Sequence, residues 1–139
     1  MTDIRKYIFL LILTLLFSCE ESKNFTDCDS CVSEEPDQAI ISAELDISNA
    51  EGIIVMVYEG RIEDNIVFDS INVYHSSKYE KRVSLNRMYT ITATYFINNK
   101  SYTVVNSTTP RVKYTETMCE EPCYFVYDRI VDLTRKYEK

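Results

Sequence analysis

The stretch "MYTITATYFI" (residues 88–97) decides the fold class of this 139-residue chain. Apolar or aromatic residues occupy its alternate positions, namely Tyr89, Ile91, Ala93, Tyr95 and Ile97, and three threonines and Phe96 lie between them. Successive side chains of a strand point to opposite faces of a sheet, so this period of two predicts a strand with one face in the core. Asn98-Asn99 follows, and asparagine tolerates the positive φ of a two-residue turn. We therefore expect residues 100–106 ("KSYTVVN") to return as the partner strand.

Six further segments have the composition or alternation of strands, at residues 39–48, 52–60, 66–75, 79–85, 111–117 and 124–134. In the first of them one face is expected to carry Ile41, Ala43, Leu45 and Ile47. After the N-terminal segment, no part of the chain keeps a helical period for three turns. We predict one all-β domain over residues 38–135, an antiparallel β-sandwich of seven or eight strands, with residues 136–139 as a C-terminal tail. Only two glycines and three prolines are present, so asparagine, serine and aspartate are expected to make the turns.

Two motifs within this block resemble those of a known family. "VMVYEG" (residues 55–60) and "SSKYEKRVSLNRMYTITATYF" (residues 76–96) resemble the transthyretin-like or carboxypeptidase-regulatory-like sandwich over about residues 53–97. Lys78 and Met88 stand where that family usually has glycine. The resemblance implies a transthyretin-like sandwich, with an immunoglobulin-like one as the alternative.

The N-terminus has the layout of an export signal. Arg5 and Lys6 precede an apolar run over residues 7–17, which as a helix is roughly 16 Å long and so about half the thickness needed to cross a bilayer. The run ends in Leu16-Phe17-Ser18-Cys19, which resembles a bacterial lipobox. The resemblance implies that residues 1–18 are a lipoprotein signal peptide and that Cys19 is the lipidated first mature residue. The alternative is an ordinary signal peptide, or a buried N-terminal helix, with an incidental thiol.

Residues 19–37 are polar and acidic and predict a lipidated tether. Glu20 and Glu21 resemble the acidic residues of surface-exported lipoproteins in Bacteroides-type bacteria. This resemblance implies the outer membrane, with the domain exposed at the surface or, alternatively, facing the periplasm. Removing residues 1–18, which carry one acidic and two basic side chains, changes the net charge from −7 to −8. An acidic domain without a basic cluster argues against nucleic acid and against electrostatic adhesion to membranes, so we expect the lipid to make the only membrane contact.

Four cysteines remain in two pairs, Cys28 with Cys31 and Cys119 with Cys123. An exported chain lies where thiols oxidise, so we predict disulfides. Sequence allows three connectivities; we favour bridges between the two pairs, because the first and last strands of a sandwich are often neighbours. Such bridges would close loops of roughly 90 residues, worth about 4 kcal/mol each. The alternatives are a zinc site with four thiolates and a redox-active C-x-x-C motif. We expect neither a metal nor a cofactor.

No catalytic constellation is evident, and we predict that the chain is not an enzyme. His75 is the single histidine, and no G-x-S-x-G motif accompanies it. Glu44 and Asp46 would share a strand face, as acidic residues on an outward face commonly do. A calcium site is a further alternative around Asp27, Asp29, Glu34, Glu35 and Asp37, although their spacing matches no calcium loop.

Tyrosine is unusually frequent, with 11 tyrosines and no tryptophan. A sugar-binding platform could include Tyr74, Tyr79, Tyr102, Tyr114, Tyr124 and Tyr127. Core packing accounts for tyrosines equally well. The leading hypothesis is a non-enzymatic scaffold or protein-interaction lipoprotein of the cell envelope, and the alternative is a glycan-binding accessory lipoprotein.

Overall fold

The computed structural model describes residues 28–136, so the predicted signal peptide, the predicted lipidation site Cys19 and Asp27 lie outside the described residues. Nine strands and two short 3-10 helices occur in this order: η1 (Cys28–Ser30), β1 (Gln38–Glu44), β2 (Gly52–Glu59), η2 (Ile62–Asp64), β3 (Val67–Val73), β4 (Lys78–Ser84), β5 (Tyr89–Ile97), β6 (Lys100–Thr108), β7 (Arg111–Thr115), β8 (Cys123–Tyr127) and β9 (Ile130–Asp132). Within residues 28–136, no helix has both the length and the apolar character needed to span a membrane.

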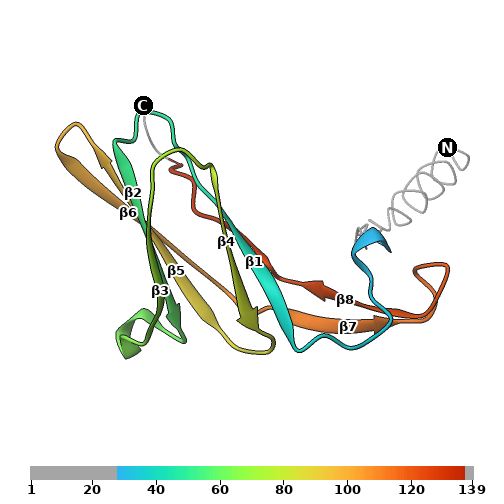
Figure 1. The fold of residues 1–139 in the computed structure, drawn as a ribbon. Coiled ribbons are helices and arrows are strands. Elements are labelled where there is room, and N and C mark those ends of the chain that lie inside the picture. The colour runs from blue at the N-terminus through green and yellow to red at the C-terminus, as the bar shows by residue number, and fades with distance from the viewer. Residues whose placement is uncertain (1–27, 137–139) are drawn as a thin grey trace, which may run out of the picture.

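Two sheets form the predicted β-sandwich (Figure 1). One has the strand order β4-β1-β9 and the other β3-β2-β5-β6. Both sheets contribute buried apolar side chains to one core, chiefly Ile41, Ala43, Leu45, Ile53, Val55, Val57, Tyr79, Val83, Tyr89, Ile91, Ala93, Tyr95, Val131 and Leu133. The all-β fold class is confirmed.

The hairpin predicted at the start is present. Asn98 and Asn99 have φ of 49° and 58°, and Ile97 pairs with Lys100 directly across the turn. All five residues expected on the inner face of β5 are buried. Thr90 and Thr92 are also buried, because β5 is a central strand with β2 and β6 on its two sides.

Asparagine and aspartate make the turns, as the shortage of glycine requires. Among the described residues, positive φ occurs at Asn49, Asn65, Asn86, Asn98, Asn99 and Asp128 besides one glycine. These short polar side chains tolerate the left-handed region better than other residues that carry a Cβ.

The expectation of a single strand over residues 124–134 is wrong. Asp128 has φ of 54° and separates β8 from β9, which raises the number of strands to nine. Strand β9 then joins the sandwich next to β1 and pairs parallel to it, with Ser42 opposite Ile130. First and last strands are therefore neighbours, as expected, but one parallel pair lies within the otherwise antiparallel sandwich. Residues on either side of Asp128 keep strand composition, so periodicity alone did not show where the chain changes sheets.

The inner face predicted for the first strand holds only in part. Ile41, Ala43 and Leu45 are buried, whereas Ile47 is 40% exposed. Strand β1 ends at Glu44, and Ile47 belongs to the loop that leads to β2.

Polar clusters join the two sheets at their margins. On the β3–β4 side, the Tyr79 hydroxyl donates to Asp69 at 2.6 Å and the Lys81 ammonium lies 3.0 Å from the same carboxylate. After β9, Arg135 lies 2.9 Å from the Asp46 carboxylate and its guanidinium is 5.2 Å from the ring centre of Tyr95. The ion pair of Arg135 with Asp46 fixes the C-terminal segment to the loop after β1.

Candidate functional site

Strands β7 and β8 form a third, two-stranded sheet that extends beyond the sandwich (Figure 1). We call β7, β8 and the turn between them, residues 111–127, the ribbon. An isolated pair of strands is marginally stable in water because it buries little apolar surface. Something outside the pair must therefore hold the ribbon in place.

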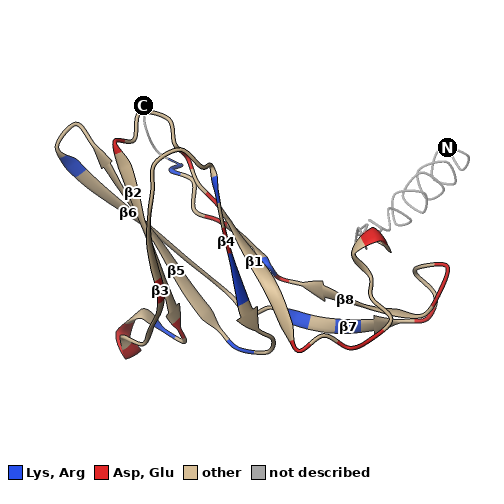
Figure 2. Ribbon diagram, viewed as in Figure 1, with Lys and Arg blue, Asp and Glu red and all other residues tan. Residues whose placement is uncertain are grey.

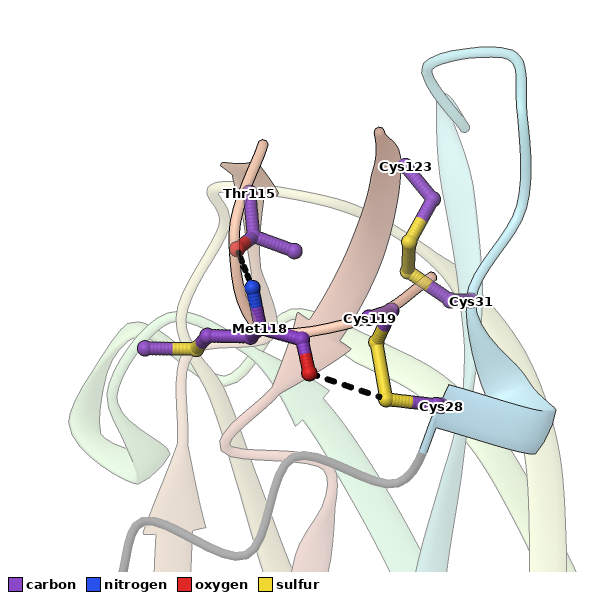
Figure 3. The surroundings of a disulfide bond; sticks show 6 residues. All are labelled: Cys28, Cys31, Thr115, Met118, Cys119 and Cys123. Atoms are coloured by element: carbon purple, nitrogen blue, oxygen red, sulfur yellow. Dashed lines mark hydrogen bonds between the residues drawn. A yellow bond between two sulfur atoms is a disulfide. The ribbon is translucent and has the colours of Figure 1, made fainter. Parts of the chain in front are cut away.

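Two disulfides supply this support (Figure 3). Cys28 is bonded to Cys119 and Cys31 to Cys123, with Cα–Cα distances of 5.7 Å in both bridges. This is the cross-pairing expected from the sequence. The reason given for that pairing does not apply, however, since both bridges attach residues 28–31 to the ribbon and not to β9, the last strand, which lies beside β1.

Backbone hydrogen bonds hold the same segment against the ribbon. The Val32 amide donates to the Tyr124 carbonyl at 2.8 Å, and the Tyr124 amide donates to the Val32 carbonyl at 2.7 Å. This reciprocal pair places Val32 as a short third strand beside β8. It also brings Cys31 next to Cys123.

The turn of the ribbon is closed by its own polar groups. The Met118 amide donates to the Thr115 hydroxyl at 3.1 Å, and the Met118 carbonyl oxygen lies 3.5 Å from the Cys28 sulfur (Figure 3). A bridged sulfur carries no proton, so the second approach is a contact and not a donated hydrogen bond. Around these groups is an open hollow of about 920 Å³.

One face of the ribbon, which we call the aromatic face, is apolar. The strand register places on it Val32, Val112, Tyr114, Tyr124 and Val126. Tyr114 and Tyr124 are directly opposite each other, and their ring centres are 4.9 Å apart at an interplanar angle of 47°. Tyr114 is 46% exposed. The face thus presents packed rings to solvent.

The opposite face of the ribbon is partly basic. Arg111 and Lys113 lie there, and they are the two blue bands on β7 in Figure 2. Phe125 and Tyr127 share this face, with ring centres 6.5 Å apart. Acidic side chains, Glu120 and Glu121 among them, surround the turn at the end of the ribbon. The ribbon therefore has two chemically different faces and an acidic tip.

The six tyrosines proposed from sequence do not form one platform. Tyr114, Tyr124 and Tyr127 lie on the ribbon. Tyr79 is buried in the core, while Tyr74 and Tyr102 are 60% and 42% exposed on the sandwich. The three valines of the aromatic face were missed. The alternation in "RVKYT" and "CYFVY" could have shown Val112 and Val126, whereas Val32 joins the face only through its pairing with Tyr124.

The remaining candidate residues lie apart. His75 is exposed, and its ring centre is 6.4 Å from that of Tyr74. Asp46 binds Arg135, and hydrogen bonds from Ser48 together with the Arg135 charge hold the Asp46 pKa below its ordinary value. Among residues 28–136, the one group of three or more metal-ligand side chains consists of Cys31, Cys119 and Cys123. The acidic residues considered for calcium, as far as they are described, form no such group.

No family model matches the chain, and neither the curated proteins nor the solved structures contain a match.

Proposed function

We propose that this chain is a non-enzymatic protein-interaction lipoprotein of the bacterial outer membrane, anchored through Cys19, whose binding surface is the aromatic face of the ribbon. One observation carries the proposed binding surface: Tyr114 is exposed on a ribbon that lies outside the sandwich core and is held by two disulfides.

A rigid exposed ring is an effective binding group. Tyrosine buries a large area at a small cost in side-chain entropy and is enriched among the residues that dominate protein interfaces. A surface that is already rigid loses less entropy when it binds. The two bridges and the Val32–Tyr124 pair restrict the ribbon in advance, which supports a binding role.

Ring packing favours a protein partner over a sugar. Sugars stack on an open ring face, whereas the rings of Tyr114 and Tyr124 lean against each other at 4.9 Å. The valines beside them add aliphatic surface, which suits an apolar protein side chain. The aromatic face is thus better matched to protein than to a pyranose.

The anchor rests on the resemblance of residues 16–19 to a lipobox, and cell fractionation tests it. We expect the Cys19→Ala chain to leave the membrane fraction, because two or more acyl chains are what hold such a protein stably on a bilayer. A Cys28→Ala chain should remain in the membrane fraction. Unchanged membrane association of the Cys19→Ala chain would contradict the anchor.

Site-specific photo-crosslinking tests the binding surface. A photo-reactive residue replaces Tyr114 in the full chain expressed in its native cells, and the same residue replaces Tyr102, which is similarly exposed on the sandwich. We expect a discrete protein adduct from position 114 and none from position 102. Adducts of equal yield at both positions, or none at position 114, would argue against the ribbon as the binding surface.

A glycan-binding role remains the second candidate, and Tyr74 is the residue that favours it. Its ring lies over Gly52, where a Cβ would come within 3.2 Å of the Tyr74 Cε1 atom. A ring that lies over a glycine and is 60% exposed offers an open face for stacking. Glycan-array binding that is lost in Tyr74→Ala and kept in Tyr114→Ala would establish this second role in place of the first.

A further inference from the structure

The four cysteine sulfurs form a single cluster at the end of the ribbon. The sulfurs of Cys31, Cys119 and Cys123 all lie within 4.8 Å of one another. Cys28, which is bonded to Cys119, adds the fourth sulfur. The two bridges are therefore adjacent, and they bring together in space two cysteine pairs that are far apart in sequence.

Contacts other than the bridges also hold these cysteines together. The reciprocal Val32–Tyr124 hydrogen bonds place Cys31 beside Cys123, and the Cys31 amide donates to the Cys28 carbonyl at 3.3 Å within η1. The Met118–Thr115 hydrogen bond shapes the turn that carries Cys119. None of these bonds uses a sulfur atom, so none of them depends directly on the oxidation state of the cysteines.

We propose that the reduced chain binds one zinc ion through the thiolates of Cys28, Cys31, Cys119 and Cys123. Zinc–sulfur bonds of about 2.3 Å in a tetrahedral site set the sulfurs about 3.7 Å apart. Reduction frees both bridged pairs to separate to that spacing, and Cys28, whose sulfur lies outside the group within 4.8 Å, must move toward Cys31 and Cys123. The C-x2-C spacing of Cys28 and Cys31 is common in structural zinc sites.

The surroundings also suit a cation. The cluster lines the open hollow at the tip, so an ion can enter from solvent. Exposed Glu120 and Glu121 line the same hollow and add negative potential. This potential attracts the cation, and the bound zinc charge in turn stabilises the thiolates.

Disulfides and zinc exclude each other in this site. Each bridge takes two electrons and two protons from a dithiol reductant, which becomes a disulfide, and yields two cysteine thiols. One zinc ion then displaces four protons from the four thiols and forms a complex with a net charge of 2−. The cluster thereby reports the redox state of its surroundings, a property separate from the binding role of the aromatic face.

Cobalt titration of the full chain tests this proposal. The chain is reduced with a dithiol, freed of reductant without oxygen, and titrated with Co²⁺, whose visible spectrum reports tetrahedral thiolate ligands; Zn²⁺ then competes. We expect one equivalent of Co²⁺ with thiolate charge-transfer bands, displaced by Zn²⁺, and no such spectrum from the oxidised chain. Absence of the bands, or binding by the oxidised chain, would overturn the proposal.

Two variants, one from each cysteine pair, and one control test the proposed ligands. Cys31→Ser and Cys123→Ser should weaken binding on the order of 100-fold or more, since loss of an outer-shell partner alone typically costs 10–100-fold. Cys19→Ser is the matched control and should leave stoichiometry and spectrum unchanged. Equal binding by Cys31→Ser, or loss of binding in Cys19→Ser, would overturn the assignment. The reduced chain without metal could lose the β-sheet signal in its circular dichroism. In that case, recovery of the signal with one equivalent of Zn²⁺ supports the site. A chain that neither recovers the signal nor binds Zn²⁺ overturns it.

Discussion

The sandwich and the ribbon are stabilised in different ways. The sandwich buries a continuous core between two sheets, and Ile91 and Tyr95 at its centre have no exposed surface. The ribbon has one buried side chain on each strand, Thr115 and Cys123, and depends on two covalent bridges. Burial of apolar surface thus stabilises one region, and restriction of the unfolded chain stabilises the other.

The ribbon shows how a short chain can hold a second region in place without a second hydrophobic core. A two-stranded ribbon has too little interior to hold its own shape. Bridges restore that shape without covering the exposed rings, so Tyr114 stays available to a partner. The ribbon can therefore be both fixed and exposed.

Removing the disulfides should have the largest effect on stability, and the effect should be far from additive. Each bridge alone closes a loop of more than 90 residues. When either is present, the other closes a ring of only nine residues, namely 28–31 and 119–123. Loop entropy then predicts a loss of about 2.5 kcal/mol for Cys28→Ser/Cys119→Ser or for Cys31→Ser/Cys123→Ser, and of about 7 kcal/mol for the chain in which all four of these cysteines are replaced.

Denaturant unfolding of the four chains without reductant measures these losses. If the losses of the two double variants add up to the loss of the variant without any bridge cysteine, the bridges act through local contacts and not through loop closure.

Truncation of a core residue should cost more than truncation on the ribbon. Ile91→Ala leaves a cavity at a fully buried site and should lower the free energy of unfolding by about 3 kcal/mol. Val112→Ala on the half-buried aromatic face should lower it by about 1 kcal/mol or less. The same denaturant titration compares them. Equal losses would mean that the ribbon is packed as tightly as the sandwich.

The β5–β6 turn should tolerate glycine but not a β-branched residue. Asn99 has φ of 58°, a region that costs a residue with a Cβ about 1–2 kcal/mol. Asn99→Val should therefore lose about 1–2 kcal/mol, while Asn99→Gly should remain close to the original chain. A neutral Asn99→Val would show that the turn changes its conformation.

The smallest expected effect is a pH dependence at the β3–β4 margin. The hydrogen bond from Tyr79, with help from Lys81, holds the Asp69 pKa below its ordinary value of 3.8. Because its pKa is lowered on folding, the Asp69 carboxylate stabilises the fold fully above pH 3.8. This contribution is lost as pH falls through the folded pKa. Burial, and then the Asp69 carboxylate, raise the Tyr79 pKa above 10.0, so its contribution is present below pH 10.0 and is lost as pH rises through the folded pKa.

Thermal unfolding between pH 5 and about 2 checks the acid limb. Asp69→Asn should reduce the slope, and Ser70→Ala on the same strand should not. An unchanged slope in Asp69→Asn would place the acid sensitivity elsewhere.

The sequence predicted the sandwich well because local chemistry and tertiary structure agree there. Alternation in residues 88–97 and the Asn98-Asn99 turn were each sufficient to identify the central hairpin. The switch at Asp128 was missed because one residue with positive φ redirects the chain while its neighbours keep strand composition.

The candidate site was predicted only in part. Redox chemistry led to the disulfides, and the expectation that the first and last strands are neighbours led to the cross-pairing, but neither led to the sheet that receives the bridges. The aromatic face depends on the register of β7 with β8 and on the bridge at Val32, which are contacts between distant segments. Tyrosine count alone could not separate the core ring of Tyr79 from the exposed ring of Tyr114.

The Cys28–Cys119 bridge also limits how far the ribbon can move from a lipid anchor. Only eight residues separate Cys19 from Cys28, and a fully extended chain spans at most about 3.5 Å per residue. If Cys19 is acylated, the tip of the ribbon stays within roughly 30 Å of the bilayer surface. Without the bridges, the first residue held to the ribbon would be Val32, through its hydrogen bonds with Tyr124, and the permitted distance would rise to roughly 45 Å. The bridges therefore limit the distance between the ribbon and the bilayer. A partner bound by the ribbon of an acylated chain must then lie within that distance of the membrane.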